Sequence, residues 1–270
     1  MLAVGNTRPE VQSAILTDAD GGAIDLVPKG TVPVQCTGSV RDQDGYTDIT
    51  KVSARIYHSG SSDGDTNGYT DHYTNASCRI YGGSAKTISY ECTFNVYFHA
   101  NPGTWYCNVT VTDTALSSSS LTASQILGVL MAIDVADGAI NYGNLALGEN
   151  TTLAGNGQQS KIVYNTGNII LDMNLDGFAA SSGDAKAMSC TSGTIDAGYQ
   201  RWSLSSGSYA KASSLTNGGV DIIPFNLAEQ NDDAATAPTS KSLYFHMMVP
   251  QTPIVKGTCT GVMQFTAIPN

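Results

Sequence analysis

The chain of 270 residues is long enough for two ordinary domains. Only 13% of its residues are charged, and Gly, Ser, Thr and Asn fill the intervals between apolar runs, which is typical of β-rich extracellular proteins. The formal net charge is -10 with only 13 Lys and Arg, so the chain repels phosphate backbones and we expect no nucleic-acid partner. No apolar stretch reaches the roughly 20 residues that span a bilayer, so we also expect no membrane span.

Alternation of apolar and polar residues with a period of two dominates the chain and predicts an all-β fold. The clearest case is 88–98, where Ile88, Tyr90 and Cys92 begin one apolar face. Turn residues separate such runs at the intervals expected of β-sandwiches. The pattern predicts strands at 32–40, 51–57, 88–98, 104–112, 126–135, 161–164, 169–175, 220–225, 243–249 and 258–267.

A polar, Ser-rich segment at 113–122 interrupts this pattern. Four of the six cysteines precede the segment and two follow it. We therefore place a domain boundary there and expect two tandem β-sandwich domains, residues 1–115 and 116–270.

The six cysteines form an even set without a CxxC pair, which favours a disulfide framework and an extracellular or cell-surface location over a zinc or redox site. A hairpin with its turn at Gly82 and Gly83 places Cys78 directly opposite Cys92, close enough for a bridge. The other pairs follow by elimination within each domain. The expected disulfides are Cys36–Cys107, Cys78–Cys92 and Cys190–Cys259.

Three Asn-x-Ser/Thr triplets agree with a secreted glycoprotein. Their acceptor residues are Asn75, Asn108 and Asn150. Because such triplets also arise by chance in Ser- and Thr-rich chains, each of the three is a candidate glycosylation site and no more.

The segment 63–71 resembles the start of a calcium loop, with oxygen-bearing residues at alternate positions and a glycine for the sharp turn. Thr74 stands where an EF-hand needs a bidentate Glu, so a complete EF-hand is excluded. The alternatives are a looser calcium site and a metal-free turn. The candidate ligands are Asp63, Asp65, Asn67, Tyr69 and Asp71. Shorter Asp/Gly patterns at 18–21 and 42–48 are interpreted first as turns, with calcium binding as the alternative.

No linear pattern indicates catalysis, and we expect no enzyme. The histidines, which we expect at the surface or at sheet edges, show no metal-ligand spacing. They are His58, His72, His99 and His246. Trp105 lies in the same alternation as Cys107 and is expected in a core, whereas Trp202 is open to either a core or a sugar-binding role.

Two segments resemble known families. Val34-x-Cys36 and Gly103-Thr-Trp105-Tyr-Cys107-x-Val-x-Val are similar to strands of immunoglobulin-like or PKD-like modules in secreted surface proteins. The resemblance covers roughly residues 7–115 and implies an Ig-like sandwich. It departs from antibody domains, because no core Trp follows the first cysteine at the usual strand and Trp105 stands at the tyrosine-corner position.

The second resemblance covers the C-terminal half. Asn165-Thr-Gly-Asn-Ile-Ile-Leu and Val249-Pro-Gln-Thr-Pro253, followed by Gly257-Thr-Cys-Thr-Gly261, resemble β-sandwich domains of archaeal and bacterial surface proteins, in the style of biofilm-fibre proteins of the TasA and camelysin type. This implies a jelly-roll-like domain and, for some members, assembly by donor-strand exchange. It implies no active site.

The leading functional hypothesis is a structural subunit of an extracellular, pilus-like filament or of a surface layer, assembled from copies of itself by β-strand addition. Residues 1–12, which begin with the apolar Met1 and end at Gln12, are one candidate donor strand, and 125–135 are another. Each has an ordinary strand of its own domain as the alternative. The competing hypothesis is a cell-surface adhesin or carbohydrate-binding module with glycan partners.

Overall fold

The computed structural model describes residues 5–151, 157–231 and 237–270. The described residues form 19 β-strands and three short 3-10 helices, η1 (Tyr46–Asp48), η2 (Ala197–Tyr199) and η3 (Tyr209–Lys211). None of the helices among the described residues has the length and apolar character needed to cross a membrane. The all-β prediction is confirmed.

The chain divides into two compact units. Unit 1 comprises Met1–Leu130, Gly167–Ile169 and Gln230–Ala237. Unit 2 comprises Met131–Thr166, Ile170–Glu229 and Pro238–Asn270. Each unit is a β-sandwich of its own, as predicted.

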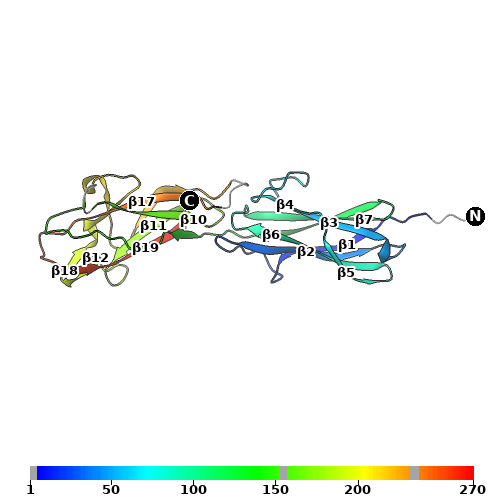
Figure 1. Cartoon of the computed structure of the whole chain (residues 1–270), viewed down its shortest axis with the longest axis horizontal. Helices are drawn as coiled ribbons and strands as arrows, with labels where there is room; N and C mark the ends of the chain where they lie inside the picture. Colours follow the sequence, from blue (N-terminus) through cyan, green and yellow to red (C-terminus); the bar gives the residue numbers. More distant parts are fainter. Residues whose placement is uncertain (1–4, 152–156, 232–236) are drawn as a thin grey trace, which may run out of the picture. The chain divides into compact units, whose positions relative to one another are not determined.

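Unit 1 consists of two antiparallel four-stranded sheets (Figure 1). The first sheet has the order β1 (Glu10–Asp18), β2 (Thr31–Arg41), β6 (Thr87–Tyr97), β5 (Arg79–Ser84). The second has the order β4 (His72–Asn75), β3 (Ile49–His58), β7 (Gly103–Asp113), β8 (Ser118–Leu127). In β7 every second residue is fully buried, starting from Trp105, so the alternation in the sequence corresponds to the core face of the strand.

The disulfide Cys36–Cys107 crosses the core of unit 1 from β2 to β7. Both residues have no exposed surface, and their Cα atoms are 6.5 Å apart. Cys78–Cys92 joins the start of the β5–β6 hairpin, where Ile80 lies opposite Tyr90 in the register expected from the sequence. In unit 2, Cys190 and Cys259 lie directly opposite each other. These are the three pairs that the sequence predicts.

The predicted domain boundary at 115/116 differs from the structure, because the Ser-rich segment is itself a strand. Residues Ser118–Leu127 form β8 and pair with β7 along its length, from Thr112 opposite Ser118 to Gly103 opposite Leu127. An edge strand with mostly exposed side chains needs no apolar alternation, since its backbone bonds to β7 hold it in place. The division between the units therefore lies after Leu130.

Unit 2 contains three sheets (Figure 1). The largest has the order β15 (Ser213–Ser214), β14 (Gln200–Ser203), β17 (Ser240–Met247), β10 (Gln159–Asn165), β9 (Ile133–Val135). The other two have the orders β16 (Val220–Leu227), β11 (Leu171–Phe178), β19 (Val262–Pro269) and β13 (Thr194–Asp196), β12 (Lys186–Ser192), β18 (Lys256–Thr260). Phe265 of β19 packs edge-on against Phe245 of β17, with ring centroids 6.0 Å apart. The sheet that contains β19 therefore faces the large sheet that contains β17.

The predicted strand at 258–267 is divided at Gly261 into β18 and β19, which pair with different strands. A Cβ atom at Gly261 would lie 2.0 Å from the carbonyl oxygen of Ala187, so only glycine fits where the chain passes that backbone. The predicted strand at 126–135 is likewise divided, between the end of β8 and β9.

The segment 1–12 is not free to act as a donor strand as a whole. From Glu10 onward it belongs to β1 and pairs with β2 of the same unit. Before that, Asn6 Nδ2 donates to Asp113 Oδ2 at 2.9 Å and Thr7 N donates to Asp44 Oδ2 at 2.6 Å. Residues 1–4 lie outside the described part of the chain.

Removal of the inter-sheet disulfide should have a larger effect than removal of the hairpin disulfide. The loop closed by Cys36–Cys107 has a sequence separation of 71 and that of Cys78–Cys92 a separation of 14. With both cysteines of a pair changed to Ala, chain entropy predicts losses in the free energy of unfolding of about 4 and about 3 kcal/mol respectively. Urea unfolding of the two double variants measures this order, and a larger loss for the hairpin pair would contradict it.

Candidate functional site: a groove beside the last strand

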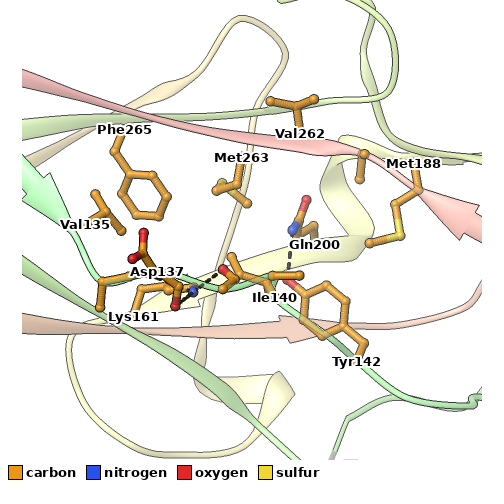
Figure 2. A pocket seen from close by; sticks show the side chains of 15 residues that line it. Val135, Asp137, Ile140, Tyr142, Lys161, Met188, Gln200, Val262, Met263 and Phe265 are labelled. Carbon is orange, nitrogen blue, oxygen red and sulfur yellow. Dashed lines mark hydrogen bonds between the residues drawn. The ribbon is translucent and has the colours of Figure 1, made fainter.

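Unit 2 contains a groove of about 420 Å³ between β19 and the irregular segment that follows β9 (Figure 2). Its apolar lining comes from β19, from Met188 of β12 and from Ile140 of the irregular segment. A second hollow of about 720 Å³ shares Ile140, Tyr142, Met188 and Gly261 with the first and extends along β18. The two hollows are therefore neighbours, and the first is called the groove below.

The β19 side of the groove is unusually apolar for a surface. Met263 and Phe265 point toward the groove in Figure 2 and are only half-buried, although they lie on the inner face of the strand. In a closed sandwich the inner positions of a strand are buried, so these side chains indicate an incompletely covered core face.

The groove lies at an open margin of the sandwich. Among the described residues β19 is hydrogen-bonded to β11 on one side and is the last strand of its sheet on the other. In the part of the chain that the structure describes, the short strand β9 is the corresponding edge of the large sheet and pairs with β10. An edge strand presents unpaired N–H and C=O groups that can bind another extended chain.

Lys161 holds the wall of the groove opposite β19. Its side chain leaves β10, is nearly buried, and points at the irregular segment in Figure 2. Nζ donates to the carbonyl oxygens of Ala136 at 3.1 Å and Asp137 at 3.0 Å, and also to that of Gly138. Three acceptors match the three donors of an ammonium group, so the buried charge fixes the path of this segment.

A second polar contact closes the inner end of the groove. Gln200 Nε2 donates to the hydroxyl oxygen of Tyr142 at 2.8 Å, and both side chains are buried. Burial raises the pKa of Tyr142, so its phenol is neutral. The contact orients the Tyr142 ring as a fixed part of the wall rather than as an acid or base.

Asp63 and Asp65, the first two predicted calcium ligands, form hydrogen bonds with different parts of unit 1. Asp63 Oδ2 accepts hydrogen bonds from Arg55 at 3.3 Å and from Asn108 Nδ2 at 3.1 Å, over the outer face of β3 and β7. Asp65 Oδ2 accepts from the backbone N–H of Ser62 at 2.7 Å, closing a local turn.

The other three candidates, Asn67, Tyr69 and Asp71, each have a different hydrogen-bond partner. Asn67 Oδ1 is 3.2 Å from His72 Nδ1, and the carbonyl oxygen of Tyr69 accepts from the Tyr73 hydroxyl at 2.5 Å. The carbonyl of Asp71 accepts from a strand N–H of β3. Among the described residues, the carboxylates of Asp63, Asp65 and Asp71 do not form a group around one point.

The candidate glycosylation sites differ in their surroundings. The Asn75 amide donates to the carbonyl of Thr93 at 3.1 Å, and the Asn108 amide donates to Asp63. Asn150 is half-buried in an isolated bridge, and the third residue of its triplet lies outside the described part of the chain. Glycosylation at all three stays a prediction.

The expectation that the histidines lie at the surface or at sheet edges is wrong for His99 and His246, whereas His72 belongs to the edge strand β4. His72, His99 and His246 are buried, and only His58 is half-buried. Local contacts explain the burial, since His246 Nδ1 lies 3.4 Å from the Thr151 hydroxyl. Burial lowers the pKa of His246, which keeps it neutral.

The structure brings together a cluster for which the sequence favoured a turn over a calcium site. Within the described residues, one carboxylate oxygen from each of Asp42, Asp44 and Asp48 lies within 4.8 Å of the other two. The Asp-x-Asp-Gly pattern was the available signal, but it is shared with ordinary turns.

Comparisons with known proteins identify no family. No family model and no curated protein matches the chain. Among solved structures it is similar to dimeric latent PorU from Porphyromonas gingivalis (12% identity, TM-score 0.31, 98% of this chain covered), and spans 20% of that chain. It is also similar to the CsuC–CsuE chaperone–tip adhesion subunit complex of Csu pili from Acinetobacter baumannii (13% identity, TM-score 0.36, 95% of this chain and 92% of that chain). A third similarity is to the C-terminal domain of the Streptococcus agalactiae polypeptide BspA (10%, TM-score 0.26, 95% and 96%). At these values the similarities carry no functional argument.

Lys161→Met tests the role of the buried ammonium. The variant leaves three carbonyl oxygens without a donor, so we expect faster amide hydrogen exchange in 136–142 and a loss of about 2–3 kcal/mol in the free energy of unfolding. The exposed Lys211→Met in the same unit is the control and should change the free energy by less than about 0.5 kcal/mol. Unchanged exchange in 136–142 would show that Lys161 does not fix the wall.

Proposed function

We infer that this protein is a structural subunit of an extracellular filament or surface layer, joined to its neighbours by strand addition. The observation that carries the proposal is the edge of β19, which has no pairing strand among the described residues and lies beside an apolar groove. In strand addition, backbone hydrogen bonds at a sheet edge supply affinity and side-chain pockets supply register. Unit 2 offers a sheet edge for such hydrogen bonds and a groove for such side chains.

The occupant is an extended segment of a second copy of the chain, with apolar residues at alternate positions. One face of such a segment would cover Met263 and Phe265, while its backbone would pair with β19. Residues 10–12 of the first candidate donor already belong to β1, and the ends of the second candidate belong to β8 and β9. A donor drawn from these strands would have to leave its own sheet.

The three disulfides support a location outside the cell, where thiols are oxidised. The proposed role is mechanical and involves no turnover. Glycosylation at the three sequons is part of the same proposal.

The alternative, an adhesin or carbohydrate-binding module, has less support. Trp105 is buried and its indole N–H donates to the carbonyl of Asn101 at 2.8 Å. Trp202 lies directly opposite the buried Phe245 in the β14–β17 ladder, which places it on the core face of its sheet. Stacking on a sugar requires an exposed aromatic face, and these positions do not favour one.

Met263→Lys tests the groove, because Met263 is half-buried and its side chain points into the groove, whereas the neighbouring Val262 points to the other face of the strand. A charge there must be desolvated when a strand enters, so we expect at least about a tenfold loss of polymer at equal concentration. Sedimentation and negative-stain electron microscopy of the full chain measure this.

Ile254→Lys is the matched control, since Ile254 is 58% exposed in the same unit but does not line the groove. It should polymerise like the wild type. Wild-type protein that stays monomeric at high concentration would contradict the filament, and equal polymerisation of both variants would exclude the groove as the contact.

A further inference from the structure

The loop 42–48, which joins β2 to β3, gathers three carboxylates. One oxygen from each of Asp42, Asp44 and Asp48 lies within 4.8 Å of the other two. Gly45 turns the loop with a φ of 119°, and its N–H donates to the Asp42 carbonyl at 3.3 Å. The loop thereby directs three side chains of like charge to one place.

Asp42 is the unusual member of this cluster. It has no exposed surface, and its Oδ1 accepts from the Asp44 N–H at 2.8 Å. Its Oδ2 is buried and has no hydrogen-bond partner among the described residues. A buried carboxylate oxygen without a donor is costly, and cations or N–H groups normally satisfy it. The ion pairs found in the described residues, Arg55–Asp63 and Lys186–Asp196, do not reach the cluster.

The surroundings add further negative charge. Asp113 of β7 is buried nearby, and its hydrogen bond from Asn6 lowers its pKa, so it is ionised. Burial raises the pKa of Asp42, and the carboxylates of Asp48, Asp44 and Asp113 raise it further. The group is therefore held where neither its charge nor its free oxygen is compensated by the protein.

We propose that Asp42, Asp44 and Asp48 form a binding site for a divalent cation with the ligand preference of calcium. Carboxylate oxygens from a short loop, completed by water, are the ligands that calcium accepts in flexible geometry. The cluster borders a pit lined by Gly5, Asn6, Asp44, Thr47 and Asp48, through which an ion and its water can enter. The proposal does not rest on the groove of unit 2.

The site also holds the N-terminal segment. Asp44 Oδ2 accepts from Thr7 N at 2.6 Å, and Asn6 Nδ2 donates to Asp113 at 2.9 Å. A bound cation would neutralise the repulsion between the carboxylates that these residues contact. It would therefore order the approach of the chain to β1.

Protonation of Asp42 is the competing explanation. A neutral Asp42 also removes the repulsion, and the carboxylate oxygens of Asp44 and Asp48, which lie within 4.8 Å, can accept its O–H, so only a calcium response separates the two explanations. Asp42→Asn imitates the neutral carboxyl, because its amide keeps an acceptor for the Asp44 N–H and removes the charge.

The test uses the full chain, with CaCl2 added to about 5 mM after treatment with a chelator, above the roughly 10⁻⁴–10⁻³ M range in which extracellular modules bind calcium. We expect calcium to raise the melting temperature of the wild type by several degrees, and titration calorimetry to show one site. Asp42→Asn and Asp48→Asn should abolish both signals. Without calcium, Asp42→Asn should melt no lower than the wild type, which shows that the variant folds.

Asp65→Asn is the matched control in the loop 63–71 and should keep the full calcium response. Loss of the response in Asp65→Asn with retention in Asp42→Asn would overturn the proposal and move the site to 63–71. The absence of any calcium-dependent shift or binding heat in the wild type would overturn it as well.

Discussion

A single buried ammonium group maintains the open margin of unit 2. An ammonium removed from water is stable only when its donors are all used, and Lys161 uses them on three successive carbonyl groups of an irregular segment. That segment therefore follows a path set by β10 rather than continuing as a strand of the sheet. Because the segment is held there, the space in front of Met263 and Phe265 stays uncovered. The groove is thus a consequence of where one charge is buried.

Unit 1 shows the opposite solution. Its two sheets are tied through their centre by Cys36–Cys107, and the core around the bridge is fully buried. The irregular feature of this unit lies at the loop 42–48, where like charges are collected rather than apolar side chains. Unit 1 therefore has a closed core and a loop with three carboxylates, whereas the core of unit 2 is partly open at the groove.

Much of the fold could be predicted from the sequence because the signals involved are local. The alternation at 88–98 corresponds to β6, and the register of the β5–β6 hairpin follows from the position of its turn. Strand β8 could not be predicted in the same way, since its residues are polar and only the ladder to β7 identifies it as a strand. The groove could not be predicted for a similar reason, because it depends on the pairing of β19 with β11, a strand that lies far earlier in the chain.

The calcium motif illustrates the limit of spacing as a signal. At 63–71 the spacing is right, but side chains of β3 and β7 hold Asp63, while a turn hydrogen bond holds Asp65. At 42–48 the spacing is poorer, yet a buried carboxylate and the distant Asp113 gather around the loop. Side-chain direction, which decides the matter, is set by contacts that a linear pattern does not contain.

Gly261 gives this architecture a marker of its own. The C-terminal chain can change from one partner strand to another only where its backbone passes within contact distance of the Ala187 carbonyl, and no side chain fits there. Any distant relative that retains the same exchange of partners must keep a residue without a Cβ atom at this point. A lone glycine between two short alternating runs, preceded by a cysteine two residues earlier, is therefore a feature by which relatives too divergent to align could be recognised.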